Sequence, residues 1–328
     1  MAPTTPLPST PTPPLVLVTD APAGLTGVRV VTLNRPAALN AFSAPLYRAA
    51  AAALVAAGAA DSGVHLLVLA ATGRAFCAGM DVREGGFGGA RDEDARCTSI
   101  DSSSSGGAPA PPPNFSAARS FMDALRHCPL PIVAAVAGPA VGIGTTLLLH
   151  CDVVYATPGS WFWTPFADRG LAPEFGSSTL GPSRLRRGAA AELLILGRRF
   201  DAPAAVAAGL VTALIEPLYH PREGREGGGG TSGGNDTDSR DDGAAVAAAV
   251  VARLAVDLAG PGVGPWLRDY KRLLAAGGAG EGADPVTTAI DREFDLLADR
   301  VRRGEPAAAA ARLRRHHQRG GVGARAML

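Results

Sequence analysis

Residues 131–156 read PIVAAVAGPAVGIGTTLLLHCDVVYA, and this stretch decides the class of fold. The apolar runs at 132–137 and 152–156 have the length and the valine content of buried β-strands. Glycines between the two runs indicate tight turns, and residues 144–150 read as a helix that glycines open. A strand, a crossover and another strand form the unit from which α/β folds are built.

The alternation continues on both sides of this stretch. Ser43 is a suitable N-cap for an alanine-rich helix, because its hydroxyl can accept a hydrogen bond from a free amide of the first turn. The pattern predicts strands at 28–34, 65–70 and 211–215, and helices at 43–57, 115–127, 190–196, 203–208, 244–258, 265–275 and 285–301. By itself, it predicts a doubly wound sheet followed by a helical region at 244–328.

Three segments have low complexity and few large apolar side chains. We expect a disordered leader at 1–14, a mobile insertion at about 85–113 and a low-complexity loop at 218–243, because such sequences bury too little apolar surface to offset the entropy of ordering. The folded core is then predicted to span residues 15–217.

Composition excludes several classes of protein. The formal net charge of +1 gives no reason to expect nucleic-acid binding, and no apolar run reaches the roughly 20 residues that span a bilayer. The four cysteines show no metal-binding spacing, and no metal site is predicted. Cys77 and Cys151 lie in apolar runs and are interpreted as small buried hydrophobic residues.

Three segments together carry a family resemblance: residues 31–42 (VTLNRPAALNAF), 73–82 (GRAFCAGMDV) and 131–156. In this order and spacing they resemble the crotonase (enoyl-CoA hydratase/isomerase) family. The resemblance implies a spiral of ββα repeats with a C-terminal helical trimerisation region. It also implies an acyl-CoA substrate and a homotrimer or hexamer.

The glycine turns suit a reaction that makes an enolate. A thioester that loses its α-proton places negative charge on the carbonyl oxygen, and rigid backbone amides can stabilise that charge. The resemblance assigns this oxyanion hole to the amides of Met80 and Ile143. The alternative is that the glycines only permit turns.

The resemblance also places coenzyme A. It puts the adenine near the backbone of Arg74, Ala75 and Ala78, and it allows Lys271 to meet a phosphate, from this subunit or a neighbour. The alternative for Lys271 is a solvated lysine on a helix.

One acidic residue stands out as a base. Hydratases of this family use two glutamates, and this chain has Thr146 and Phe166 at those positions. The stretch 164–178 (TPFADRGLAPEFGSS) instead resembles monofunctional, peroxisomal-type 3-enoyl-CoA to 2-enoyl-CoA isomerases, whose single glutamate corresponds to Glu174. The family usually has glycine where Phe175 stands. The alternative is that Glu174 is an acidic residue near a helix N-terminus without a catalytic role.

The predicted reaction is an isomerisation in unsaturated fatty acid β-oxidation. Glu174 moves a proton from C2 to C4 in a pocket formed by Phe166, Leu171 and Phe175, and no cofactor is required. Other family reactions, such as hydration or thioester hydrolysis, remain alternatives, as does a non-catalytic acyl-CoA-binding protein like the chromatin-associated relatives of this family.

Several residues are assigned supporting roles. We expect Asp81 and Asp152 to provide hydrogen bonds, Asn40 to fix a turn, and His65 and His150 to be structural.

The expected location is the peroxisome, with cytoplasm or mitochondrion as alternatives. Residues 326–328 (AML) match a peroxisomal address in part.

Overall fold

A computed structural model describes most of the predicted core and the helices that follow it. The described residues are 13–21, 25–81, 83, 113–218, 242–258, 263–276, 284–306, 308–309 and 311. The predicted leader, the insertion at 85–113 and the loop at 218–243 fall almost entirely outside these residues, as do Cys97 and residues 312–328.

The main sheet has six strands in the order β1-β2-β3-β4-β6-β9. β1 runs antiparallel to β2, and the other neighbours are parallel. The strands are β1 (Val16–Asp20), β2 (Val28–Leu33), β3 (Leu66–Ala71), β4 (Ile132–Val136), β6 (Val153–Ala156) and β9 (Ala213–Leu214). The strands predicted from apolar runs are therefore present, with small shifts at their ends.

A second sheet, which the sequence pattern did not predict, has three short strands. They are β5 (Pro139–Val141), β7 (Trp161–Trp163) and β8 (Phe200–Asp201), in the order β5-β7-β8. The chain passes from β4 in the first sheet to β5 in the second, and again from β6 to β7. This arrangement corrects the doubly wound sheet predicted from pattern alone and agrees with the spiral that the resemblance implied.

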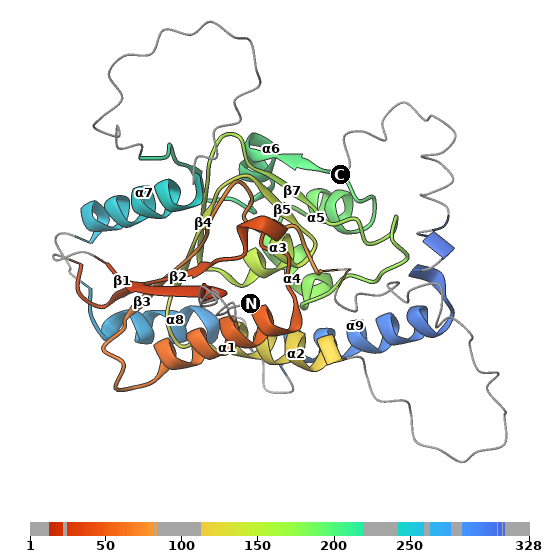
Figure 1. The fold of residues 1–328 in the computed structure, drawn as a ribbon, viewed down its shortest axis with the longest axis horizontal. Coiled ribbons are helices and arrows are strands. Elements are labelled where there is room, and N and C mark those ends of the chain that lie inside the picture. Colours follow the sequence, from red (N-terminus) through yellow and green to blue (C-terminus); the bar gives the residue numbers. More distant parts are fainter. Residues whose placement is uncertain are drawn as a thin grey trace, which may run out of the picture.

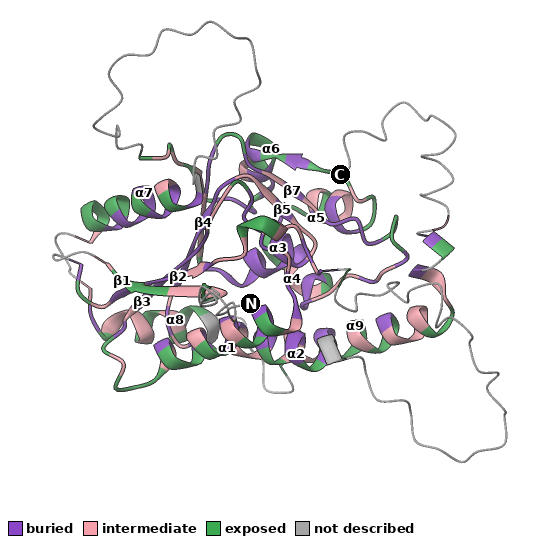
Figure 2. Ribbon diagram, viewed as in Figure 1, coloured by how far each residue is buried: buried purple, intermediate pink, exposed green. Residues whose placement is uncertain are grey.

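Helices cover both faces of the main sheet (Figure 1). Along β2, Val31 and Leu33 belong to the core shared with α1 (Ala44–Gly58) and α2 (Pro113–Arg126). Val28 and Val30 point to the opposite face, into the core shared with α7 (Asp242–Asp257). This alternation is the period of two residues expected of a strand, and the strands of the interior are accordingly buried (Figure 2).

The remaining helices connect the sheets or follow them. Ser43 caps α1 as predicted, since its side chain accepts a hydrogen bond from the amide of Leu46. The predicted helix at 144–150 is an α-turn followed by a 3-10 turn. The helices that connect or follow the sheets are η1 (Pro36–Ala38), α3 (Ile143–Thr146), η2 (Leu147–His150), α4 (Ser177–Arg184), α5 (Arg187–Leu194), α6 (Ala202–Ala208), α8 (Trp266–Ala276) and α9 (Pro285–Arg302).

The helix α9 is attached to α2 by charged side chains. Arg119 of α2 donates a hydrogen bond to Asp291 at 2.7 Å, and its guanidinium lies 5.7 Å from the ring centre of Phe294. Arg126, near the end of α2, forms an ion pair with Asp284, the N-cap of α9. The two helices therefore form one side of the molecule (Figure 1).

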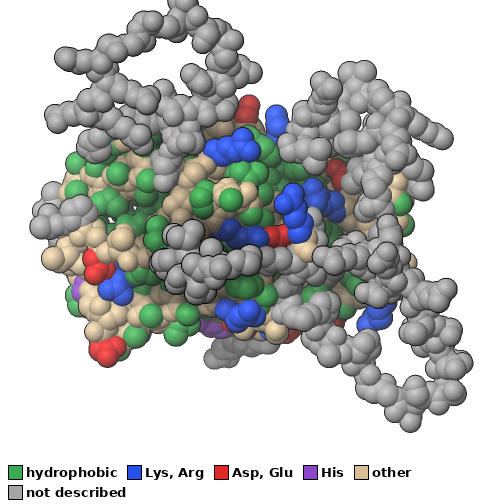
Figure 3. Space-filling view, in the orientation of Figure 1, with side chains coloured by type: hydrophobic (Ala, Val, Ile, Leu, Met, Phe, Trp, Pro, Cys, Tyr) green, Lys and Arg blue, Asp and Glu red, His purple; other side chains and the backbone are tan. Residues whose placement is uncertain are grey.

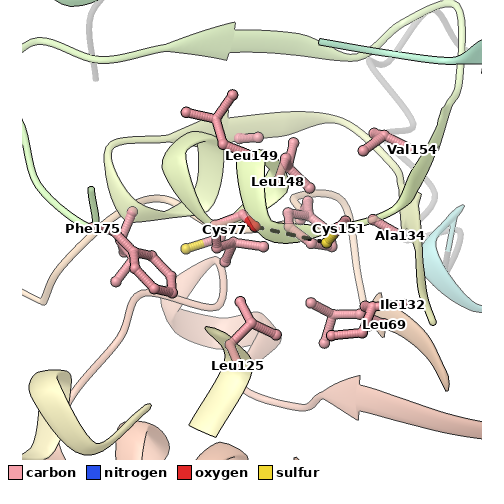
Figure 4. Close-up of a cluster of buried hydrophobic side chains, with 14 of the residues drawn as sticks. Leu69, Cys77, Leu125, Ile132, Ala134, Leu148, Leu149, Cys151, Val154 and Phe175 are labelled. Atoms are coloured by element: carbon pink, nitrogen blue, oxygen red, sulfur yellow. Dashed lines mark hydrogen bonds between the residues drawn. The ribbon is translucent and has the colours of Figure 1, made fainter. Parts of the chain in front are cut away.

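The larger core contains the free thiols of Cys77, Cys128 and Cys151. Figure 4 shows Cys77 and Cys151 among apolar side chains, with Phe175 at one end of the cluster. Burial raises the pKa of each of these two thiols to about 12, so both stay protonated at neutral pH. Their predicted role as small hydrophobic residues fits this environment.

The described residues form no broad basic face on the side drawn in Figure 3. Basic and acidic side chains lie there in small groups among apolar and neutral ones (Figure 3). None of the helices in the described part of the chain is long and apolar enough to cross a membrane.

Candidate active site

The first glycine turn holds Met80 against η1 and the residues that follow it. Phe42 donates its amide to the Gly79 carbonyl at 2.8 Å and accepts the amide of Asp81 at 2.9 Å. Gly79 has a φ of +100°, which favours glycine. Phe42 thus bonds to the residues on either side of Met80. The amide of Met80 itself donates to no acceptor among the described residues.

A partly buried ion pair between Arg35 and Asp81 supports this turn. Arg35 donates to the carboxylate of Asp81 at 2.5 Å and to the carbonyl of Ala41 at 3.0 Å. Burial alone would raise the pKa of Asp81, but the hydrogen bonds from the Arg35 side chain and the Arg83 amide outweigh it and lower that pKa. Asp81 therefore stays ionised and holds the turn in place, as expected of a supporting residue.

Asn40 fixes the neighbouring turn. Its side-chain oxygen accepts the amide of Arg35, and its side-chain nitrogen donates to the carbonyls of Thr72 and Ala75, each at 2.8 Å. The predicted role of Asn40 is confirmed.

The second glycine turn begins α3. Gly142 has φ 54° and ψ −120°, and its carbonyl accepts the amides of Thr145 and Thr146. Ile143 is the first residue of the helix, and within the described part of the chain its amide has no acceptor. An N–H group in this position points away from the helix and carries the positive end of its dipole.

The two turns lie directly against each other. Cys77, which precedes the first turn, accepts the amide of Val141 at 2.8 Å and donates its own amide to Pro139 at 3.1 Å. A Cβ added at Gly142 would lie 3.8 Å from the Cα of Gly79. The structure therefore brings the predicted Met80 and Ile143 segments together at one site.

Glu174 faces the second turn. Its Oε1 lies 3.9 Å from the position that a Cβ at Gly142 would take. Burial raises the pKa of Glu174 to about 8, and the negative charge of Glu293 adds to this effect. The result is a carboxyl group that is more basic than usual and lies beside the amide-bearing turn.

His150 holds the loop that carries Glu174. Phe175 has a positive φ of 62°, an uncommon conformation for a bulky residue. Its carbonyl accepts a hydrogen bond from Nε2 of His150 at 2.7 Å, and the two rings stack with centres 4.0 Å apart. Burial lowers the pKa of His150 to about 4, so the ring is neutral and Nε2 carries the donated proton. The structural role predicted for His150 is confirmed.

An apolar pocket opens beside Glu174. Its lining residues are Tyr47, Met80, Phe115, Ala118, Met122, Glu174, Phe175, Glu293, Phe294 and Leu297. Most of these side chains are apolar or aromatic, and the two glutamates supply its carboxylates. The pocket therefore suits a hydrocarbon chain that ends at a reactive polar group.

The predicted acyl-pocket residues differ in their positions. Phe175 lines the pocket as expected. Phe166 is buried but does not line it, because residues 164–171 form a turn in which the Leu171 amide bonds to the Phe166 carbonyl. Leu171 also lies outside the lining and packs on the cluster of Phe115, Ala172 and Leu297.

Sequence reasoning missed the residues from α1, α2 and α9. Phe115, Ala118 and Met122 occupy one face of α2 at helical spacing, so the apolar period of that helix was an available signal. Nothing local marked Glu293, which lies more than 110 residues from its hydrogen-bonding partners.

The predicted coenzyme A contacts have mixed environments. Ala75 is buried and its carbonyl accepts from Asn40, whereas Arg74 is exposed and Ala78 is half-buried. Lys271 is neither solvated nor free: its ammonium donates to the Leu130 carbonyl at 2.8 Å and to Asp152 at 2.9 Å. A phosphate would have to compete with this ion pair. Asp152 thereby has the supporting role expected of it.

The two hydratase positions carry no carboxylate. Thr146 is fully buried, and its hydroxyl has no hydrogen-bond partner among the described residues. Phe166 is also buried. Over the described ranges, no group of three or more His, Cys, Asp or Glu residues is placed to hold a metal ion.

Comparison with known families identifies the class of protein. A family model described as enoyl-CoA hydratase/isomerase matches residues 28–220, which is more than half of the chain. The chain belongs to the enoyl-CoA hydratase/isomerase family.

Curated and solved relatives agree with this assignment. Enoyl-CoA delta isomerase 2 of Rattus norvegicus is 34% identical over 186 residues, covering 57% of this chain and 43% of the relative. A Rhodobacter capsulatus protein named "Probable enoyl-CoA hydratase" is 30% identical over 185 residues, covering 56% of this chain and 64% of the relative. The chain thus spans less than two thirds of the length of either curated relative.

A solved enoyl-CoA hydratase/isomerase from Pseudoalteromonas atlantica T6c superposes with a TM-score of 0.65 at 28% identity. The match covers 90% of this chain and 95% of that one. The crotonase-like fold is thereby established.

Proposed function

We propose that this protein converts 3-enoyl-CoA to 2-enoyl-CoA, with Glu174 as its single acid–base residue. The observation that carries the proposal is the position of the Glu174 carboxyl, which faces Gly142 at the start of α3 and borders an apolar pocket. A carboxyl group, two free amides and a hydrocarbon pocket are the parts that proton transfer beside a thioester requires.

The proposed mechanism has two proton transfers. Ionised Glu174 removes a proton from C2, and the electrons move into a dienolate whose oxygen accepts hydrogen bonds from the Met80 and Ile143 amides. Glu174 then returns the proton to C4, so the double bond moves from C3–C4 to C2–C3. The raised pKa of about 8 brings the carboxyl closer in basicity to the carbon acid, which favours transfer in both directions. This chemistry needs no metal or redox cofactor.

The alternative of hydration is less well supported. Adding water needs one group to activate it and another to deliver a proton. Thr146 and Phe166 stand at the hydratase positions, and the second pocket carboxylate, Glu293, already accepts two backbone amides. We therefore expect hydration of 2-enoyl-CoA to be far slower than isomerisation.

The test is an assay of the purified protein with 3-hexenoyl-CoA. Isomerisation raises the absorbance of the conjugated enoyl thioester without releasing free coenzyme A, which separates it from thioester hydrolysis. We expect Glu174→Gln to reduce kcat by at least about 10³-fold, the usual scale for loss of a general base, while the affinity for an acyl-CoA stays within threefold.

Glu192→Gln provides a matched control, because it removes one carboxylate from α5, outside the pocket. Near-normal turnover by the Glu174→Gln protein would remove this residue from the mechanism.

Assembly and cellular role are part of the proposal. We propose a homotrimer or hexamer that acts in β-oxidation of unsaturated fatty acids in the peroxisome. Sedimentation of the purified protein tests the first point, and localisation of the tagged chain tests the last.

A further inference from the structure

The loop that carries Glu174 ends at a helix without a local cap. α4 begins at Ser177, and its N-cap is Gly176, which has no side chain to accept the free amides of the first turn. These amides are among the four at each helix start that lack an intrahelical partner. A buried helix start without acceptors would be costly, so the acceptor has to come from elsewhere in the fold.

Glu293 of α9 supplies it. One carboxylate oxygen accepts the amide of Gly176 at 2.6 Å, and the other accepts the amide of Ser178 at 2.9 Å. Glu293 is only 6% exposed, so these charge-assisted hydrogen bonds are shielded from water. The negative charge also meets the positive end of the α4 dipole.

The packing around Gly176 brings α9 close to the loop. A Cβ added at Gly176 would lie 2.8 Å from the Cγ1 of Val286 and 3.4 Å from the Cγ1 of Ile290. Both of those residues belong to α9, with Val286 about two turns and Ile290 about one turn before Glu293. The Glu174 loop is therefore bound on one side by His150 and on the other side by α9.

We propose that Glu293 is the positioning residue for Glu174: it clamps the start of α4 and thereby fixes the direction of the catalytic carboxyl toward the oxyanion hole. This inference rests on the proposed isomerase function. Glu293 itself does not exchange protons with substrate, because both of its oxygens already accept backbone amides.

The negative charge of Glu293 also acts on the pKa of Glu174, and the other ionisable groups described near Glu174 do not cancel this effect. Burial is the main cause of the raised pKa of Glu174, and Glu293 adds to it. Among the groups near Glu174, Tyr47 and Cys77 have pKa values raised by burial and are neutral, as is His150. Arg119, which lies over Phe294, is paired with Asp123 and Asp291.

The test compares Glu293→Gln and Glu293→Asp with the exposed α9 variant Asp295→Asn, in the full-length protein with 3-hexenoyl-CoA. Glu293→Gln keeps the shape but loses the charge, and its amide nitrogen cannot accept a backbone N–H. We expect kcat to fall at least tenfold with KM within threefold, and the acidic limb of the pH–rate profile to move to lower pH. Glu293→Asp keeps the charge but is one methylene too short to reach both amides, so kcat should fall without that pH shift.

Hydrogen exchange tests the clamp without relying on activity. In the wild-type protein the amides of Gly176 and Ser178 should be protected, and in Glu293→Gln they should exchange at least tenfold faster. Asp295→Asn should leave them unchanged. Unprotected amides in the wild-type protein, or Glu293→Gln kinetics and pH profile equal to those of Asp295→Asn, would overturn the inference. If the wild-type protein shows no isomerase activity, the proposed function fails, while the exchange data still decide whether Glu293 clamps α4.

Discussion

Glu174→Gln should make the protein more stable in alkaline solution, although it removes the proposed catalytic base. The folded protein holds the proton of Glu174 up to a pKa of about 8, whereas the unfolded chain releases it near 4.5. Between these values the folded state binds more protons than the unfolded state, so stability falls as the pH rises. Above about pH 8 both states are ionised and the loss is complete.

The size of the effect follows from the two pKa values. Their difference, about 3.5 pH units, corresponds to about 5 kcal/mol at 1.36 kcal/mol per unit. Water that enters through the pocket screens part of this cost, so we expect about 2 to 5 kcal/mol. Glutamine has nearly the same shape and does not ionise, so the variant avoids this cost at every pH.

Urea unfolding at pH 5 and at pH 9, at one protein concentration, measures the effect. The variant and the wild-type protein should have similar free energies of unfolding at pH 5. At pH 9 the variant should be more stable by about 2 to 5 kcal/mol. Glu192→Gln controls for the loss of one carboxylate. A difference between variant and wild type that stays constant from pH 5 to pH 9 would refute the raised pKa and the buried environment from which it follows.

Two further predictions concern the turn before β5 and the acyl pocket. Gly138→Ala should destabilise the protein by at least about 2 kcal/mol in urea unfolding, because Gly138 has a φ of +68° and a Cβ would lie 2.2 Å from the Arg74 carbonyl oxygen. Gly159→Ala, where a Cβ meets open space, is the near-neutral control, and equal stability of the two variants would contradict the argument. Leu297→Trp should fill the pocket and lower kcat/KM for 3-decenoyl-CoA about tenfold more than for 3-hexenoyl-CoA. Its exposed neighbour offers the control Leu296→Trp, and an unchanged ratio would show that the acyl chain lies elsewhere.

The predicted site residues fall into two groups: those that a local sequence motif marks, and those whose contacts depend on distant parts of the chain. Met80 and Ile143 each follow a glycine in a recognisable motif, and Glu174 lies in a motif of its own, so sequence comparison could find all three. Lys271 was assigned to a phosphate from the family resemblance, but its charge is already paired with Asp152, 119 positions away. Phe166 was assigned to the pocket from nearness in sequence to Glu174, and the turn between them directs it elsewhere.

The sequence by itself determined five of the six strands of the main sheet, most helices, the cap of α1 and the family, because apolar periodicity, capping residues and glycine turns act over a few neighbouring residues. The edge strand β1 was not predicted. Only the tertiary structure decided the second sheet, whose strands have two or three residues and are too short to show a period. It also decided which side chains of α1, α2 and α9 enclose the pocket, and that Glu293 meets the start of α4. Contacts between residues more than 100 positions apart depend on how whole elements pack, and no local pattern of residues specifies that packing.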